Sequence, residues 1–358
     1  MSAPLQLATP ADGGEILRIL ESSAAKGLIE LIYTRRPDAY ASYEAEPGES
    51  RVFVSKDGER TVGTCAEIIR PVYLGGETAT AAYVCGLKKD AGYEGDVGFY
   101  LSFIRSLQRE DIDFYYCSVV GDNREAMAMF RKGKRAITVT PMATYRTYIL
   151  NPRLRIPSPR KDLTLRPATE ADLPALLAFL NTEGRRRDLF PVVRSLSDFH
   201  GLRPSDFYLL EGREGLVATA ALWDQIDYRQ YAVKRYRGPM KAARLLGPLL
   251  SALGYIRLPR EDEPLRFPML SFLLAKEEDE GLYRALLSAL FPIVARRYGV
   301  LVLGLPADKE APHPLGRMLD HLPSIHFDST LCAIAFPWSP RPLRAPNPHH
   351  LHPECGML

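Results

Sequence analysis

The chain has 358 residues, of which 46% are hydrophobic and 25% charged, and its formal net charge is +3. This length exceeds what one hydrophobic core usually organises, so we expect two domains. The composition is that of an ordinary globular protein, and so slight a charge indicates neither a nucleic-acid nor a membrane partner. No apolar run is long enough to cross a bilayer and the N-terminus does not resemble a secretory signal, which predicts a cytoplasmic protein.

The first half of the chain mixes helical and strand patterns without regular alternation. Apolar spacing predicts helices at residues 13–24, in a second stretch up to about 43, at 97–108 and at 123–132. Alternating patterns predict strands at 51–56, 61–73, 78–88 and 114–120. This order favours an α+β architecture, with a mainly antiparallel central sheet and helices packed on it.

One stretch of this half, "YVCGLKKDAGYEGDVGFYLSFI" at residues 83–104, leads from a strand through a Gly-rich loop into a helix. Consecutive backbone N–H groups followed by a helix N-terminus suit an anion such as a phosphate. Gly92, Gly95 and Gly98 would let a ligand approach the backbone closely. A plain surface turn explains the same spacing, so the two interpretations stay open at this point.

The second half begins as the first one does. "LQLATPADGGEILRIL" at residues 5–20 is echoed by "LTLRPATEADLPALLAFL" at 163–180, each a short strand, a capping turn and an amphipathic helix. The Pro-rich, basic stretch at 151–162 lies between the copies and resembles a linker. We therefore predict an N-terminal domain at 1–157, a C-terminal domain at 158–340 and a tail at 341–358.

The second half also continues in a similar order. It is predicted to contain strands at residues 207–211, 216–223, 269–274, 299–306 and 329–338, and helices at 281–297 and 313–319. Where the first half has its Gly-rich loop, this half has "KEEDEG" at 276–281. A row of carboxylates repels a phosphate, so we expect no anion site there.

The tail is rich in proline and hydrophilic residues, which predicts a mobile or surface-draped segment. It contains His349, His350, His352 and Cys355, but their spacing matches no organised metal-binding motif. We therefore predict no metal site.

The order of elements in both halves, about residues 4–150 and 163–336, resembles the GCN5-related N-acetyltransferase superfamily. The resemblance implies two tandem domains of that fold and an acyl-CoA co-substrate, such as acetyl-CoA, whose pyrophosphate binds the loop after the fourth strand. In "GDNREAMAMFRKG", residues 121–133, the family's Asn-x-x-Ala-x-x-Leu-Tyr pattern is matched at similar spacing. The residues at the family's cofactor-binding positions are Leu87, Lys88, Lys89, Tyr93, Gly95, Asp96, Val97, Gly98, Asn123 and Phe130.

This cofactor motif is degenerate in the present sequence. Glu94 and Asp96 lie where the pyrophosphate of the family's co-substrate would bind, and only Lys88 and Lys89 offset their charge. Phe130 replaces a tyrosine that in many relatives protonates the departing thiolate, and a phenyl ring cannot donate a proton. The departures leave open whether the loop binds the co-substrate.

Transfer from a thioester to an amine needs a base for the amine, a donor to the oxyanion and an acid for the sulfur. Glu67, on a predicted strand, is the candidate base, although a lone strand glutamate is more often solvated or ion-paired. Tyr116 and Ser118, on "DFYYCSVV", are candidates for the hydroxyl near the thiolate, although tyrosines in strands mostly pack in the core.

Three functions compete on this basis. The leading hypothesis is an N-acyltransferase whose working site lies in the N-terminal domain and whose acceptor is a small-molecule amine or a peptide. The alternative is an inactive binding or regulatory module, because a fold alone does not fix a function. A tRNA-dependent aminoacyl or peptidyl transferase is disfavoured by the near-neutral charge. The acceptor's identity stays open, and so does a homodimer.

Overall fold

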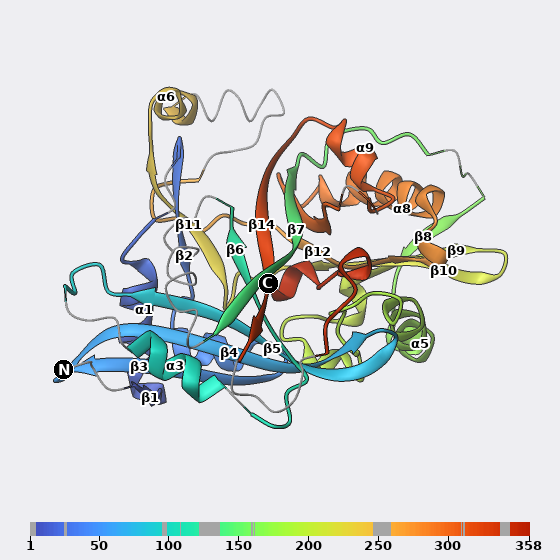
Figure 1. Cartoon of the computed structure of the whole chain (residues 1–358). Coiled ribbons are helices and arrows are strands. Elements are labelled where there is room, and N and C mark those ends of the chain that lie inside the picture. The colour runs from blue at the N-terminus through green and yellow to red at the C-terminus, as the bar shows by residue number, and fades with distance from the viewer. Residues whose placement is uncertain are drawn as a thin grey trace.

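The computed structural model describes residues 5–24, 27–94, 99–107, 109–121, 137–158, 160, 162–245, 259–308, 310, 312–336 and 344–358. The strands of these residues form a 12-stranded sheet and a separate two-stranded ribbon, with helices packed against them (Figure 1). The predicted α+β class is therefore confirmed. Among the helices in these ranges, none has both the length and the apolarity that a bilayer span requires.

The first half contributes the following helices and strands. They are β1 (Leu5–Leu7), α1 (Gly13–Glu21), β2 (Ile29–Thr34), α2 (Ala39–Glu44), β3 (Glu49–Asp57), β4 (Arg60–Leu74), β5 (Glu77–Lys89), α3 (Phe99–Leu107), β6 (Phe114–Val120) and β7 (Thr138–Leu150). β2 lies where the second predicted helical stretch was expected, so that prediction was wrong over these residues. "IELIYT" alternates between more and less buried positions, the pattern of a strand. The predicted helix at 123–132 lies outside the described residues.

The second half contributes a similar series with a few additions. They are β8 (Thr164–Pro167), α5 (Leu173–Gly184), β9 (Phe207–Gly212), β10 (Gly215–Trp223), β11 (Gln230–Tyr236), α6 (Pro239–Leu245), β12 (Met269–Ala275), α8 (Glu280–Val294), β13 (Leu301–Pro306), α9 (Gly316–Asp320) and β14 (Ser324–Ala335). β11 pairs with β2 to form the ribbon, which therefore links the two halves.

The two halves exchange their last strands. The sheet order is β1-β3-β4-β5-β6-β14-β7-β13-β12-β10-β9-β8. β14, from the second half, pairs with β6 of the first, and β7, from the first half, pairs with β13 of the second. β7 and β14 also pair with each other along their lengths, as the adjacent green and red strands of Figure 1 show. Each half therefore completes the sheet of the other.

The sheet contains the same irregularity twice. The pairing of β4 with β5 shifts between Thr64 and Ala66, and that of β10 with β12 shifts between Thr219 and Ala221. In both cases one extra residue on the partner strand is left out of register, which is a β-bulge. The two bulges therefore show which residues of the two halves are equivalent in a region beyond the sequence repeat at 5–20 and 163–180.

The bulged residues share an unusual backbone conformation. Gly86 in β5 has φ of 62° and Phe272 in β12 has φ of 51°, both in the left-handed region. Cys85 pairs with Ala66, and its counterpart Ser271 pairs with Ala221. The two halves are thus structural repeats, and the bulged residue lies at the equivalent place in both.

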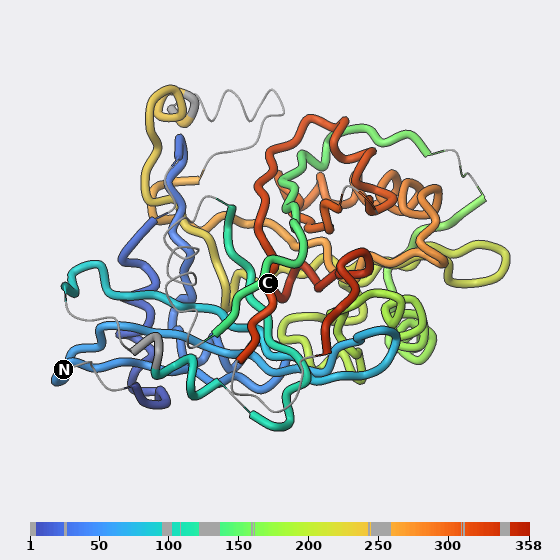
Figure 2. Tube along the Cα trace, in the orientation of Figure 1, coloured from blue at the N-terminus to red at the C-terminus, as the bar shows by residue number. Residues whose placement is uncertain are grey.

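The tail differs from its prediction. Residues 344–358 turn back into the molecule, and the tube in Figure 2 follows them to the end marked C. Leu351, Cys355 and Met357 are 0%, 7% and 4% exposed. The expectation of a mobile or surface-draped tail was therefore wrong, because these apolar side chains, spaced among prolines and histidines, reach the interior.

Candidate functional site

The sheet is open at one place in the first half. β5 and β6 run parallel and pair only from Ala81 to Tyr83 of β5 and from Phe114 to Tyr116 of β6. Both strands continue beyond that pairing, β5 as far as Lys89, without further pairing to each other. We call this place the β5–β6 separation. Backbone groups that lack a strand partner in the middle of a sheet are available to a ligand.

Gly86 lies on β5 within this separation. Its φ of 62° disfavours any side chain, and a Cβ atom there would also overlap the hydroxyl of Tyr43 from α2. The positive φ favours glycine without requiring it, because the equivalent Phe272 carries a side chain at φ of 51°, and the space taken by Tyr43 excludes a Cβ atom. The bulge at Gly86 changes the direction of the backbone between the half of β5 that pairs with β6 and the half that leads to the Gly-rich loop.

The second half has a corresponding separation, but its own chain fills it. β12 and β13 are parallel and pair only at Met269 and Val302. The backbone N–H of the bulged residue Phe272 donates to Glu354 Oε2 of the tail at 2.7 Å. The tail's Gly356 packs so tightly that a Cβ there would approach Trp223 and Ser271. The tail thus occupies the β12–β13 separation and satisfies its bulge amide.

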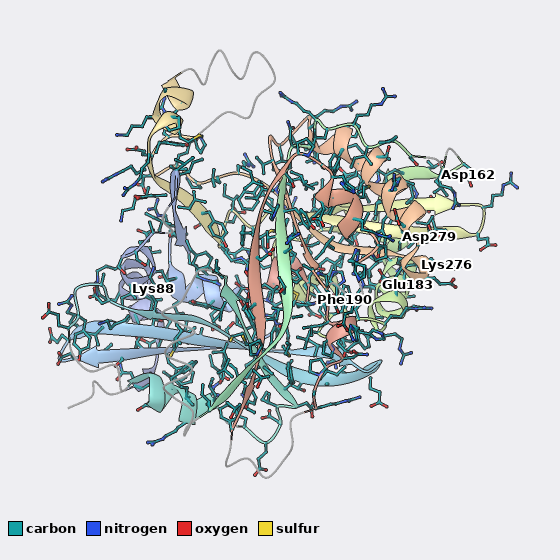
Figure 3. All side chains as sticks on the ribbon, turned by 45° about the horizontal axis from the view of Figure 1, so that its top comes forward. Lys88, Asp162, Glu183, Phe190, Lys276 and Asp279 are labelled. Carbon is teal, nitrogen blue, oxygen red and sulfur yellow. The ribbon has the colours of Figure 1, made fainter. Side chains whose placement is uncertain are left out.

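In the loop after β12, the carboxylates bind other groups of the protein. Arg187 donates to both oxygens of Glu278, at 2.7 and 3.0 Å, and the Tyr283 hydroxyl donates to Glu278 at 2.7 Å. Burial alone would raise the pKa of Glu278, but Arg187 lowers it to about 2. Asp279 accepts from the Leu282 N–H and so caps α8. Figure 3 labels Asp279 beside Lys276 and Glu183 at this end of the second half.

The start of the Gly-rich loop in the first half is held differently. The carboxylate of Asp90 accepts from Arg18 at 2.8 Å and from Arg60 at 2.7 Å. Burial opposes ionisation, but these two guanidinium groups, with the Gly92 N–H, keep the pKa of Asp90 well below its ordinary value. The first acidic residue of the loop is therefore already neutralised by partners within the protein.

The predicted cofactor ligands on β5 point in different directions. The ammonium group of Lys88 donates to the carbonyl oxygens of Leu20 and Ser23 at the end of α1, and Figure 3 labels Lys88 there. Burial, and then the nearby Lys234, lowers the pKa of Lys88 to about 8. Lys88 therefore does not offset the charge of the loop, contrary to the prediction.

The other ligands at this end of β5 lie on the other side of the strand or in the loop. Leu87 packs in the cluster that α3 covers. Lys89 donates to the carbonyl oxygen of Tyr93 at 2.7 Å and so closes the start of the loop. The remaining predicted ligands lie outside the described residues, and their assignment stays a prediction: Gly95, Asp96, Val97, Gly98, Asn123 and Phe130.

Glu67 faces the side of the sheet that α3 covers. Its strand neighbours Cys65 and Ile69 belong to the cluster around α3, and its Oε1 is ion-paired with Arg51. Burial raises the pKa of Glu67 to about 7, with Arg51 opposing the rise. A carboxyl group that titrates near neutral pH suits a general base, but this one is fully buried and already paired.

Tyr116 and Ser118 lie on the opposite face of the sheet. The Tyr116 ring packs 5.1 Å from the ring of Tyr83, between centroids. Burial raises the pKa of the Tyr116 hydroxyl, which therefore keeps its proton at neutral pH. Strand alternation places the partly buried Ser118 on the same face. The structure thus brings Tyr116 and Ser118 together and puts Glu67 on the other side.

A group of buried charges, which sequence analysis missed, lies on the same face as Tyr116. We call Arg35, Glu46, Arg70 and Arg229 the arginine cluster. Glu46 accepts from Arg35 at 2.7 Å and lies 3.7 Å from Arg229. Burial would raise the pKa of Glu46, but Arg229, Arg35 and Arg70 lower it, so the group stays a carboxylate. It is consequently a weak base.

A cavity of about 510 Å³ opens onto this cluster between the two halves. It is lined by the turn after α2, by β4 and by residues 191–200 of the second half, and its wall includes Glu46, Arg70, Phe199 and Met357. A volume of this size is typical of small-molecule sites. The sequence signal for it is Arg70 itself, a single cation within the apolar run "CAEIIRPVY" at residues 65–73.

Comparisons with known proteins identify the fold but not a relative in sequence. No protein-family model matches the chain, and no curated protein does. A GCN5-related N-acetyltransferase from Sphaerobacter thermophilus has a TM-score of 0.53 at 13% identity, over 92% of this chain and 94% of that one. Saccharomyces cerevisiae N-myristoyltransferase with bound myristoyl-CoA gives 0.58 at 9% identity, over 98% and 84%. A probable N-acyltransferase from Enterococcus faecalis gives 0.52 at 9% identity, over 94% and 73%.

Proposed function

We propose that this chain, which has the fold of the GCN5-related N-acetyltransferases, transfers an acyl group from acyl-CoA to an amine acceptor. We place the working site in the first half, at the β5–β6 separation. The observation that carries the proposal is the difference between the two bulge amides. In the second half the Phe272 N–H donates to Glu354 of the chain's own tail, whereas its counterpart Gly86 follows Cys85, on which the charges of the arginine cluster act.

The C-terminal half supports an oxyanion role for Gly86. The Glu354 oxygen bound to the Phe272 N–H shows that an amide at this bulge can bind a side-chain oxygen within the separation, even though burial raises the pKa of Glu354. In acyl transfer, attack of the amine nitrogen on the thioester carbon forms a tetrahedral intermediate whose oxygen becomes negative. We propose that the Gly86 N–H stabilises this oxygen.

The remaining steps concern protons. When the intermediate collapses, the carbon–sulfur bond breaks and the thiolate requires a proton. We propose that Tyr116, which is protonated at neutral pH, or Ser118 on the same face supplies it. Glu67 has a suitable pKa for the base. Its position on the α3 face argues against direct contact with an acceptor in the 510 Å³ cavity.

Acyl-CoA is the proposed co-substrate, bound with its phosphates at the loop between β5 and α3. The direct test is a calorimetric titration of the full chain with acetyl-CoA. A double variant, Gly95→Glu with Gly98→Glu, adds two carboxylates to the loop and should abolish binding by electrostatic repulsion. The matched control is Gly281→Glu in the corresponding acidic loop of the second half, which should leave acetyl-CoA binding unchanged.

Micromolar binding that only the loop variant loses would support the acyltransferase. No heat at millimolar acetyl-CoA would instead favour a module that kept the fold and lost the chemistry. Glu94 and Asp96 in the loop motivate that alternative. Detectable release of CoA with any amine acceptor would exclude it.

A further inference from the structure

Arg70 is a buried cation without a hydrogen-bonded anion among the described residues, although Glu46 lies close enough for the two charges to interact. Its side chain is 3% exposed, and its Nε and Nη2 atoms have no hydrogen-bond partner among the described residues. Its Nη1 donates only weakly, to the Met357 carbonyl oxygen at 3.4 Å. An unpaired buried guanidinium group is costly for a folded protein, so proteins rarely keep one without a use for it.

The second half shows how the same position looks when it is satisfied. Arg70 lies four residues after Ala66 within β4, and Gln225 lies four residues after Ala221, just past the end of β10, so we compare the two by their distance from the equivalent bulges. Gln225 donates to the Gly356 carbonyl oxygen of the tail at 2.7 Å and accepts from Arg229 at 3.0 Å. At this position the first half has a cation, Arg70, whereas the second half has a neutral amide, Gln225, which binds the tail.

The side chains of the arginine cluster have a positive balance, and Arg229 also donates to the main-chain oxygen of Leu358 at 3.0 Å. Within the described part of the chain, the arginine cluster combines three guanidinium groups with one carboxylate, and Glu46 is already shared by Arg35 and Arg229. The cluster acts on Cys85, the residue before Gly86, whose thiol pKa is raised to about 11 by burial while Arg35 opposes the rise. The unbalanced charge therefore lies close to the bulge at which we propose acyl transfer.

The cavity beside Arg70 lies on the acceptor side of that bulge. The Gly-rich loop follows β5 beyond Gly86, whereas Arg70 pairs with Ala81, before Gly86 on the same strand. Phosphates bound at the loop and a ligand bound at Arg70 would therefore approach Gly86 from opposite ends of β5. The 510 Å³ volume is enough for a small molecule but not for a folded partner.

We infer that the amine acceptor carries a carboxylate and that Arg70 binds this carboxylate in the cavity between the two halves. That the ligand is the acceptor of an acyl group rests on the proposed function. The anion site itself follows from the unpaired guanidinium group and the cavity. A planar guanidinium with free Nε and Nη2 donors fits the two oxygens of a carboxylate. Amino acids are therefore the substrate class that the site fits.

The test is calorimetric binding of amino acids to the full chain without acyl-CoA. The probes are the twenty protein amino acids, β-alanine and 4-aminobutyrate, each compared with its amide, which lacks the negative charge. We expect at least one acid to bind, with its amide bound at least tenfold more weakly. Arg70→Met should weaken binding of that acid at least tenfold, whereas Arg194→Met, at an exposed arginine of the same cavity wall, should change it less than twofold.

Folding of the Arg70→Met protein is checked by thermal unfolding. Because the variant replaces an unpaired buried charge with an apolar side chain, its Tm without ligand should equal or exceed that of the wild type. The binding acid should raise the Tm of the wild type and not that of the variant. An Arg70→Met protein that folds and still binds the acid would overturn the inference.

The remaining outcomes separate this inference from the proposed function. No binding by any acid, equal binding of acid and amide, or a loss that follows Arg194 instead of Arg70 would each overturn the carboxylate site. Acetyl-CoA titration of the same proteins tests the co-substrate independently. Acetyl-CoA binding without amino-acid binding would refute the inference alone, and amino-acid binding without acetyl-CoA binding would refute the acyltransferase while leaving the carboxylate site in place.

Discussion

The two halves of this protein keep the same backbone at the bulge and differ in what lies beside it. In the first half Gly86 lies within the β5–β6 separation. In the second half Phe272 is fully buried, and its N–H is bound by Glu354 of the tail. The comparison teaches that duplication preserved the geometry of the sheet, whereas access to it was kept in one copy and closed in the other.

Side chains at matching positions also differ between the two halves, in whether they are charged. The charged residues Glu67 and Arg70 of β4 correspond to Leu222 and Gln225 of the second half. Buried charges are costly and are usually retained where they act on a ligand. The contrast is the basis of our proposal that the chemistry lies in the first half and that the second half supports it. The following changes would break or sharpen it.

Deletion of residues 345–358 should have the largest effect, because it empties the β12–β13 separation. The tail buries Leu351, Cys355 and Met357, and each such side chain contributes roughly 1.5–3 kcal/mol when fully buried. We expect the free energy of unfolding in urea to fall by more than about 5 kcal/mol. Arg344→Ala is the control, since its partner Glu77 is exposed. A deletion protein as stable as this control would show that the tail does not support the second half.

Glu278→Gln should come next. The substitution leaves Arg187, whose side chain is 5% exposed, without its counter-charge. Breaking a buried ion pair from one side costs about 3–5 kcal/mol, which denaturant unfolding would measure. Glu214→Gln breaks a pair between exposed side chains in the same region and should cost less than about 0.5 kcal/mol. Equal costs for the two variants would contradict our description of the closed loop.

Glu67→Leu should alter how stability depends on pH, since it gives β4 the residue of the second half. The folded pKa of about 7 lies above the ordinary 4.5, so the native state binds more protons between these values. Its stability is full below pH 4.5 and falls as pH rises to 7, by roughly 3 kcal/mol.

The Glu67→Leu protein should lack this fall, and urea unfolding across the pH range measures it. Glu77→Gln, at an exposed partner of Arg344, serves as the control and should keep the fall. Parallel stability curves for the Glu67→Leu protein and the wild type would mean that Glu67 is not the titrating group.

Gly86→Ala should have the smallest effect on stability, about 2 kcal/mol, because it adds backbone strain at a positive φ. Part of the cost is the overlap of the new Cβ with the Tyr43 hydroxyl. Tyr43→Phe removes that oxygen, so the alanine should cost less in a Tyr43→Phe protein. A double-mutant cycle measures the difference, and strict additivity would exclude the overlap as a cause.

The sequence predicted much of the fold because its signals are local. Apolar periodicity located β4, β5, β6 and α8, and the repeated capping turns revealed the duplication. Partner choice is not local: nothing in the sequence near residue 335 indicates that β14 pairs with β6 of the other half. β2 was mistaken for a helix because six residues carry too little pattern to separate the two periods.

The site was less predictable than the fold. Tyr116 and Ser118 were found because alternate residues of one strand share a face. Arg35 and Glu46 flank α2, and they meet Arg229 of the second half only in the folded chain. The tail was misjudged because its prolines and histidines concealed Leu351 and Met357, which pack in two different clusters that form only in the folded chain.

The strand exchange has a consequence for biosynthesis. β6 ends at Val120, and its neighbour in the sheet, β14, begins at Ser324. A ribosome adds about 5–20 residues per second, so the partner of β6 appears roughly 10–40 seconds after β6 itself. During that time a nascent first half carries an uncovered strand edge, which is prone to pair with other chains. Production of this protein should therefore respond strongly to chaperone supply and growth temperature, even where the finished molecule is stable.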